Sequence, residues 1–351
     1  MATRNLDVLT RLSMSPLIRM DHQALQEEVG RLWWQHAMAG DLEQAWRQSD
    51  RLLHARVDLS HLPRFFRPIW DGRPLSGADV WLKCWRGLGD AIHYIRYAAP
   101  VRARCTRLIV EAPDELHRLF AKVPGIDELV VIDEGRRIGP EFVQIESTEL
   151  PYALRTTLAS IPQTVPYLWT EPAGRVPNDG HRNVGLCWAG GDYDARRHVP
   201  LAALAPLQNV PGIRFWQLQR GPALAQIAQA GFRFENLGDE TMDVSATGSL
   251  VAELDLVITI DSMVAHLAGA SAKPVWTLLH AEADWRWFRD RDDSPWYPTM
   301  RLYRQTVAGE WRDVIERTAA DLQKMPEMTV SVGCRVSGKV RSSERLRPTG
   351  P

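Results

Sequence analysis

A single stretch near residue 260 constrains the fold more than any other part of the chain. An apolar run, Leu254–Ile260, ends at Asp261-Ser262; a helix carrying His266 follows, and then a second apolar strand at Lys273–Leu279. The order strand, polar turn, helix, strand is typical of a parallel α/β sheet. Ligands bind at the carboxyl ends of such strands, and the amino end of a helix favours an anion such as a diphosphate. Asp and Ser are also common N-caps, so this stretch alone leaves a ligand site and a simple cap equally open.

The same alternation of strands and helices recurs along most of the chain. In the first half, strands are predicted at 80–85, 107–112, 128–133 and 141–147, with helices at 91–103, 113–123 and 152–161. In the second half, strands are predicted at 183–190, 213–219, 254–260 and 273–279, with helices at 200–207, 222–231, 245–254 and about 310–324. Such alternation implies parallel sheets with right-handed crossovers. We therefore predict an α/β protein with two Rossmann-like halves and a cleft between them, where small molecules commonly bind.

The ends of the chain and two linkers set the expected domain boundaries. Residues 1–20 show no clear pattern, and two short helices are predicted between 21 and 57, separated by Gly40-Asp41 as a C-cap followed by an N-cap. This pair resembles one degenerate tetratricopeptide-type hairpin, which must pack on the next domain or on a partner. Segments rich in Pro and Gly at 67–77 and 162–180 read as linkers. We predict a helical segment at 1–69, Rossmann-like domains at 70–170 and 178–324, and a disordered tail at 325–351.

Composition excludes several classes of function. The net charge is −1, so no basic field points to nucleic acid. The sequence contains no secretory signal and no apolar run long enough to cross a bilayer. The four cysteines (Cys84, Cys105, Cys187 and Cys334) lack the spacing of a metal site, and Cys84 and Cys187 fall in strand-like runs that predict buried thiols. We expect a cytoplasmic protein without a metal site and with at most peripheral membrane contact.

Five motifs, taken together and in order, resemble a known family. They are RGLGDAIHYIRY (86–97), VGLCWAG with RRHVPL (184–190 and 196–201), IRFWQLQRGP (213–222), LDLVITIDSMVAHLAGASAKPVW (254–276) and DWRWFRDRDDSPWYP (284–298). The motifs resemble glycosyltransferase family 9, the heptosyltransferase-like family, in the subgroup found behind bacterial tetratricopeptide repeats. The resemblance covers about 70–322. It implies a GT-B fold of two facing Rossmann-like domains, with the donor mainly on the second and the acceptor mainly on the first, and metal-independent, inverting transfer.

Asp90 is the candidate catalytic base. It ends the GLGD loop at the top of the first strand, and it matches the position of the family's catalytic aspartate. Inverting transfer needs one base to take the proton of the acceptor hydroxyl. The competing interpretation is that Asp90 only caps the next helix. The loop is not a dinucleotide-binding motif, because the G-x-G-x-x-G pattern is broken at Ile92.

The remaining candidates lie in the second half, where the resemblance places the donor. Without a metal, a leaving diphosphate needs preorganised cations and N–H donors. Arg197 matches a family arginine, although His198 stands where the family has serine and the preceding loop is shorter; solvent-exposed arginines are the alternative. Asp261 is expected near a donor hydroxyl or fixing the turn, and His266 near the donor or packed in the core. The predicted donor-binding set is Arg196, Arg197, Gln219, Gly221, Asp261, Ser262, Met263, Val264 and His266.

The aromatic block near residue 290 has a structural interpretation. Trp285, Trp287 and Trp296 are expected to pack the join between the domains, since burial is the usual place of aromatic side chains. A platform on which a sugar stacks is the less favoured alternative.

These expectations define a function and its competitors. The sequence predicts a glycosyltransferase that moves a sugar, with ADP-heptose as one candidate donor, to a hydroxyl of a glycan, a lipopolysaccharide core or a protein. Beyond this donor, no cofactor is expected. One competitor is a catalytically degenerate domain that serves as a binding or scaffold module, and another is an epimerase of the same fold. The fold alone does not fix the substrate.

Overall fold

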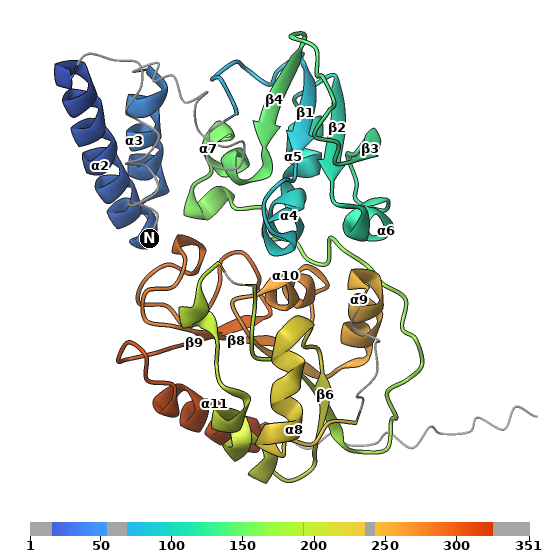
Figure 1. Ribbon diagram of the computed structural model, residues 1–351. Coiled ribbons are helices and arrows are strands. Elements are labelled where there is room, and N and C mark those ends of the chain that lie inside the picture. The colour runs from blue at the N-terminus through green and yellow to red at the C-terminus, as the bar shows by residue number, and fades with distance from the viewer. Residues whose placement is uncertain (1–15, 55–68, 192, 236–242, 326–351) are drawn as a thin grey trace, which may run out of the picture.

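The chain folds into two parallel α/β domains with a helical hairpin at the amino-terminal side. The computed structural model describes residues 16–54, 69–191, 193–235 and 243–325 (Figure 1). The predicted tail from 326 onward and the loop at 236–242 lie outside the described residues. Each domain contains one sheet with all strands parallel, which confirms the predicted class of fold.

The first sheet has the strand order β3-β2-β1-β4. The side chains of β1 are nearly all buried, as expected for a strand with helices on both faces. Its strands are β1 (Asp79–Lys83), β2 (Arg107–Ala112), β3 (Glu128–Val131) and β4 (Phe142–Glu146). The connecting helices are α4 (Leu88–Tyr94), η1 (Ile95–Tyr97), α5 (Ala98–Arg102), η2 (Asp114–Leu116), α6 (His117–Phe120), η3 (Ser147–Glu149), α7 (Leu150–Ala153) and η4 (Leu158–Ser160).

The second sheet has the order β6-β5-β7-β8-β9. Every residue of β5, β7 and β8 is buried, so these strands form the centre of the domain. The strands are β5 (Arg182–Cys187), β6 (Ile213–Gln217), β7 (Leu256–Ile260), β8 (Val275–Leu279) and β9 (Met300–Arg304). The helices are η5 (Ala195–Arg197), η6 (Leu201–Asn209), η7 (Gly221–Ala225), α8 (Gln226–Ala230), α9 (Val244–Glu253), α10 (Met263–Ala270), η9 (Trp285–Trp287) and α11 (Arg312–Lys324).

Several local predictions were wrong. The amino-terminal helix begins at Pro16, within a segment for which no structure was expected. The helix predicted at 152–161 ends at Ala153, because Arg155 adopts a left-handed backbone conformation with φ of 52°. The helix predicted at 200–207 is a 3₁₀ helix, and Pro206 inside it cannot donate the hydrogen bond that an α-helix needs. The strand β9 was not predicted.

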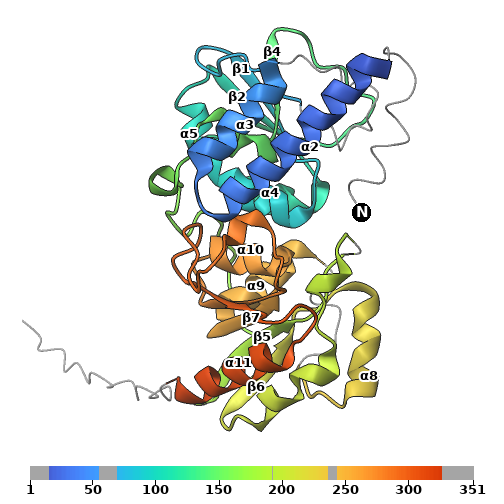
Figure 2. The ribbon, with the colours of Figure 1, turned by 90° about the vertical axis from the view of Figure 1, so that its left-hand side faces the viewer.

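The helical hairpin consists of α2 (Pro16–Met38) and α3 (Leu42–His54). Gly40 has φ of 78° at the turn, and Asp41 accepts a hydrogen bond from the Gln44 N–H at 3.3 Å, so the predicted pair of caps is confirmed. The hairpin lies against the first domain (Figure 2), where Trp46 Nε1 donates to the Thr156 carbonyl at 2.7 Å. Its likeness to a tetratricopeptide unit stays a prediction.

The hairpin also touches the second domain. The Arg289 N–H donates to the Met38 carbonyl at 2.7 Å. The Trp33 ring meets the Trp285 ring edge to face, with centroids 5.6 Å apart. The expectation that the helices pack on the domain that follows is therefore confirmed, and the hairpin bridges both domains.

The two domains meet where α4 faces α10 (Figure 1). A Cβ atom on Gly89 would lie 3.0 Å from the His266 Cδ2 atom and 3.3 Å from the Met263 Cα atom, so the backbones approach closely there. At the same join, the buried Arg96 donates to the Trp296 carbonyl at 2.5 Å and to the Tyr167 hydroxyl at 2.9 Å. The join is thus a packed polar core, not a loose hinge.

The aromatic block and the cysteines lie where the sequence predicted. Trp285, Trp287 and Trp296 are buried, and Trp296 packs on His93 of the first domain. Cys84 and Cys187 are buried free thiols. Across the described ranges, no helix is both long and apolar enough to cross a lipid bilayer.

Candidate functional site

A cleft of about 1570 Å³ lies between the two domains, beside their packed join. Its walls are formed by residues that directly follow β1, β5, β6, β7 and β8, together with side chains of the helical hairpin. Ligands bind at these carboxyl ends of parallel strands. All ten predicted site residues line this one cleft, although their chemical roles stay predictions.

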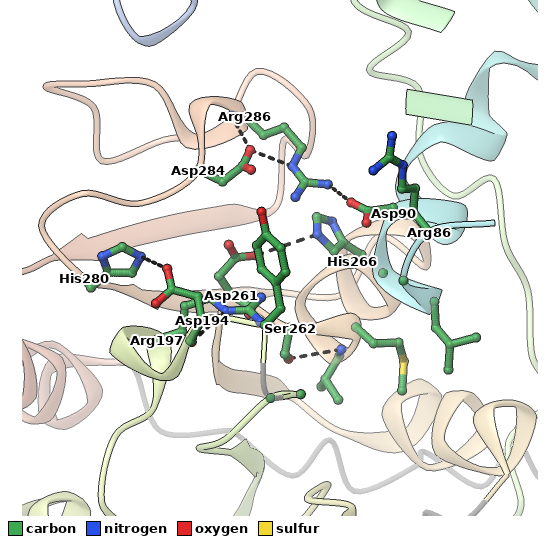
Figure 3. A pocket seen from close by; sticks show the side chains of 18 of the residues that line it. Arg86, Asp90, Asp194, Arg197, Asp261, Ser262, His266, His280, Asp284 and Arg286 are labelled. Carbon is green, nitrogen blue, oxygen red and sulfur yellow. Dashed lines mark hydrogen bonds and ion pairs between the residues drawn. The ribbon is translucent and has the colours of Figure 1, made fainter. Parts of the chain in front are cut away.

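Asp90 reaches the cleft from the first domain (Figure 3). It lies in the first turn of α4, not in the preceding loop, because the helix begins at Leu88. The N-cap is Gly87, so the competing interpretation of Asp90 as the cap is wrong. A carboxylate in the first turn is still favoured by the helix dipole. The Asp90 side chain is 26% exposed, and its Oδ1 atom accepts a hydrogen bond from Arg286 Nη1 of the second domain.

Arg286 is held between two carboxylates. Its Nε atom donates to Asp284 Oδ1 at 2.9 Å, and the Asp284 side chain also accepts from the Arg286 backbone N–H at 3.0 Å. The Arg286 carbonyl accepts from Trp296 Nε1 at 2.8 Å. Burial opposes the charge, but the Asp284 and Asp90 carboxylates outweigh it and raise the pKa of Arg286 well above its ordinary value. Arg286 therefore stays charged and links the two domains.

The turn after β7 forms the floor of the cleft. Ser262 is the N-cap of α10, and its hydroxyl accepts from the Val264 N–H at 3.2 Å. The cap interpretation of this serine is thus confirmed. The Val264 N–H is used in the cap, whereas the Met263 N–H has no hydrogen-bond partner within the described residues.

Asp261 and His266 are both buried beside this turn. Their Oδ1 and Nε2 atoms are 3.8 Å apart. Burial raises the pKa of Asp261 and lowers the pKa of His266 well below its usual range. The histidine is therefore neutral near pH 7, and the contact is not an ion pair.

His266 belongs to a hydrogen-bonded chain that crosses the domain join. The Tyr297 hydroxyl lies 2.9 Å from His266 Nδ1 and 3.0 Å from His93 Nδ1 on α4. Burial also lowers the pKa of His93 well below its usual range. The His266 ring stacks on Trp287 with centroids 5.4 Å apart. This histidine thus has a structural role and also lines the cleft.

The two predicted arginines differ in how their charges are paired. Arg196 is exposed and forms ion pairs with Asp194 and Glu282, each at 2.7 Å. The hydrogen bond from Arg196 lowers the pKa of Asp194 to about 2. Arg197 instead donates from Nη1 to the Asp261 carbonyl at 3.1 Å and from Nε to the Asp194 carbonyl at 3.3 Å. In the described part of the chain no carboxylate pairs with it, so Arg197 is the better placed of the two to meet an anion.

Gln219 shapes the cleft through its hydrogen bonds to the backbone. Its Oε1 atom accepts from the Trp188 and Ala189 N–H groups at 3.1 Å and 2.8 Å. Its Nε2 atom donates to the Arg220 carbonyl at 2.7 Å. These bonds fix the segments that follow β5 and β6 against each other. Gly221 follows with φ of 72° in a left-handed turn at the cleft wall.

Sequence reasoning missed several cleft residues. Asp284 and Arg286 were noted only as parts of a motif, because the ion pair to Asp90 spans 196 positions and leaves no local pattern. His280 and Glu282 come directly after β8, so the strand-end rule could have found them. Trp33 and Trp34 of the hairpin also line the cleft, and Trp34 is 43% exposed.

Three comparisons place the chain among known proteins. No family model matches the chain. Protein FlbA of Caulobacter vibrioides is 28% identical in an alignment 313 residues long, which covers 76% of this chain and 50% of that protein. The chain thus spans about half the length of the curated relative it matches.

Similar solved structures include three bacterial proteins. ADP-heptose lps heptosyltransferase II of E. coli is 14% identical with a TM-score of 0.48, covering 70% of this chain and 99% of that one. Heptosyltransferase WaaC of E. coli with ADP is 10% identical with a TM-score of 0.46, covering 70% and 99%. A glycosyl transferase family 9 protein of Veillonella parvula is 14% identical with a TM-score of 0.45, covering 66% and 87%. None of these likenesses assigns a function to this chain.

Proposed function

We propose that this chain is a glycosyltransferase that moves a sugar from a nucleotide-diphosphate donor to a hydroxyl acceptor by metal-independent, inverting transfer. One observation carries the proposal. A carboxylate of the first domain, Asp90, and an arginine of the second domain without a carboxylate partner among the described residues, Arg197, line the same cleft. A base and an anion-binding cation on opposite walls are what such a transfer needs.

In the proposed reaction, Asp90 is the base, and Arg197 with the Met263 N–H binds the leaving diphosphate. The Asp90 carboxylate takes the proton of the acceptor hydroxyl as that oxygen attacks the anomeric carbon. The bond from the anomeric carbon to the diphosphate oxygen breaks, and the diphosphate leaves with the electron pair. Its charge is met by the Arg197 guanidinium and the Met263 N–H at the start of α10, an eight-residue helix whose dipole favours an anion there.

Donor and acceptor are proposed by class. A nucleotide sugar, with ADP-heptose as one candidate, is the only small molecule the reaction requires, and no further cofactor is invoked. The acceptor is a hydroxyl of a glycan, a lipopolysaccharide core or a protein. We place the reaction in the cytoplasm, with at most peripheral contact to a membrane.

The test is a panel of ADP-, UDP- and GDP-linked sugars offered to the full 351-residue chain. Binding is measured by calorimetry, and turnover is measured as release of free sugar or as transfer. Wild type is compared with Asp90→Ala and Arg197→Ala, and Arg291→Ala serves as a matched control because Arg291 pairs with Asp293 away from the cleft lining.

The outcomes separate the proposal from its competitor. Turnover lost in Asp90→Ala with binding retained supports the base, and binding weakened tenfold or more in Arg197→Ala supports the diphosphate position. If no donor binds wild type at millimolar concentration, the transferase proposal fails and a binding or scaffold module takes its place.

A further inference from the structure

We infer that Arg286 is the positioning residue for the catalytic base, so that a side chain of the second domain orients the base carried by the first. The inference rests on the proposed function and deepens it. It starts from one contact that joins the domains: Arg286 Nη1 donates to Asp90 Oδ1 (Figure 3).

The charge balance around Arg286 argues against a role as the diphosphate ligand. Two carboxylates, Asp90 and Asp284, already pair with its single positive charge. A diphosphate that binds Arg286 would have to compete with both carboxylates. Arg197 pairs with neither of them, so its charge is not compensated in this way. The arginine that binds the donor and the arginine that holds the base are therefore different residues.

The contact leaves Asp90 with the geometry of a base. Its Oδ1 atom is occupied by Arg286, and no hydrogen bond to Oδ2 is found among the described residues. Oδ2 lies on the Gly87 side, 3.5 Å from where a Cβ atom on that glycine would be. Because the side chain is 26% exposed and lines the cleft, an acceptor hydroxyl can reach it. One oxygen is fixed and the other is open.

Arg286 is rigid enough to serve as an anchor. Asp284 binds both its backbone N–H and its Nε atom, and Trp296 binds its carbonyl. Its Trp285 and Trp287 neighbours are buried. Holding a catalytic group in one orientation lowers the barrier by removing the entropy of alignment. The charged and titratable groups around the pair are Asp284, Asp261, Tyr94, His93, His266, Tyr297 and, beside Asp90 in Figure 3, Arg86.

The experiment compares wild type, Arg286→Gln and Arg286→Lys in the full chain, with Arg291→Gln as the matched control. The substrate is whichever sugar of the ADP, UDP and GDP panel wild type turns over. The readouts are kcat, KM and the Kd for the free nucleoside diphosphate. We expect Arg286→Gln to lower kcat at least 100-fold while Kd stays within threefold.

The split between kcat and Kd, together with the lysine variant, separates positioning from a purely structural role. Arg286→Lys should recover only part of the turnover lost in Arg286→Gln, because a single ammonium keeps the positive charge but cannot bridge Asp90 and Asp284 as a planar fork does.

Three results would overturn the inference. They are turnover within threefold of wild type in Arg286→Gln, a loss of diphosphate binding equal to the loss of turnover, and turnover in Arg286→Lys no higher than in Arg286→Gln. Wild type that turns over no donor refutes the proposed function instead, and the inference falls with it.

Discussion

Replacing Tyr297 with phenylalanine tests the hydrogen-bonded chain that joins the domains. The substitution keeps the ring, which is fully buried, and removes one hydroxyl. That hydroxyl lies within 3.0 Å of nitrogens on His93 of the first domain and His266 of the second. We expect a large loss of stability, because both partners are buried away from water.

The positions of the protons follow from the bonding pattern. His93 Nε2 is buried without a hydrogen-bond partner in the described structure, so its proton belongs on Nδ1, which donates to Tyr297. The Tyr297 hydroxyl then donates to His266 Nδ1, which places the His266 proton on Nε2, facing Asp261. Phenylalanine leaves a buried donor and a buried acceptor unpaired, at about 1–3 kcal/mol each. We expect a total cost of about 2–6 kcal/mol.

The assay is urea unfolding at pH 7.5, monitored by circular dichroism, and the comparison requires that the m value be the same in all variants. Tyr303→Phe is the matched control, since that hydroxyl donates to Asp321 at 3.1 Å away from the domain join. Its expected cost is about 1.5–3 kcal/mol, the range for a hydrogen bond to a charged group. A cost for Tyr297→Phe no larger than that of the control would refute the proposed order of protons.

Three further predictions concern the same join and the hairpin. Gly89→Ala should lower donor turnover about tenfold or more with the fold retained, because its Cβ atom pushes against His266 and Met263; unchanged turnover in steady-state assays would contradict this. Below pH 6.5, the free energy of unfolding should fall by about 1.4 kcal/mol per pH unit for each buried neutral histidine, because only the unfolded chain takes up the proton. In His266→Asn, the slope of the unfolding free energy against pH should be smaller by one such amount. Trp46→Ala should destabilise the chain by about 3–5 kcal/mol in urea unfolding, because it empties a buried site and leaves the Thr156 carbonyl without its donor.

The sequence was sufficient for the layers of the fold but not for contacts between distant segments. Runs such as Leu256–Ile260 are buried along their whole length, and this pattern is visible as continuous apolar residues. The order of strands and helices and the turn at Asp261 followed from it. The strand β9 was missed because Arg301 and Arg304 interrupt its apolar pattern and an aromatic block precedes it.

In the candidate site, too, the residues marked by local sequence could be predicted, and those that depend on distant contacts could not. Asp90 and Ser262 could be found because each directly follows a strand or opens a helix. Arg286 could not, since its partner lies in another domain and only the packing of α4 on α10 brings the two together. The difference between Arg196 and Arg197 was also hidden, because adjacent residues in the sequence point to different partners in space.

The packed join between α4 and α10 has a consequence for how substrates pass through the cleft. Moving the domains apart would break the hydrogen bond from Arg96 to the Trp296 carbonyl and the hydrogen bond between Tyr297 and one of its two histidines. Both losses are costly for buried groups. The cleft is therefore a slot with fixed walls, entered from its open side. A ligand is therefore expected to enter and leave through the mouth of the cleft, without a movement of one domain away from the other.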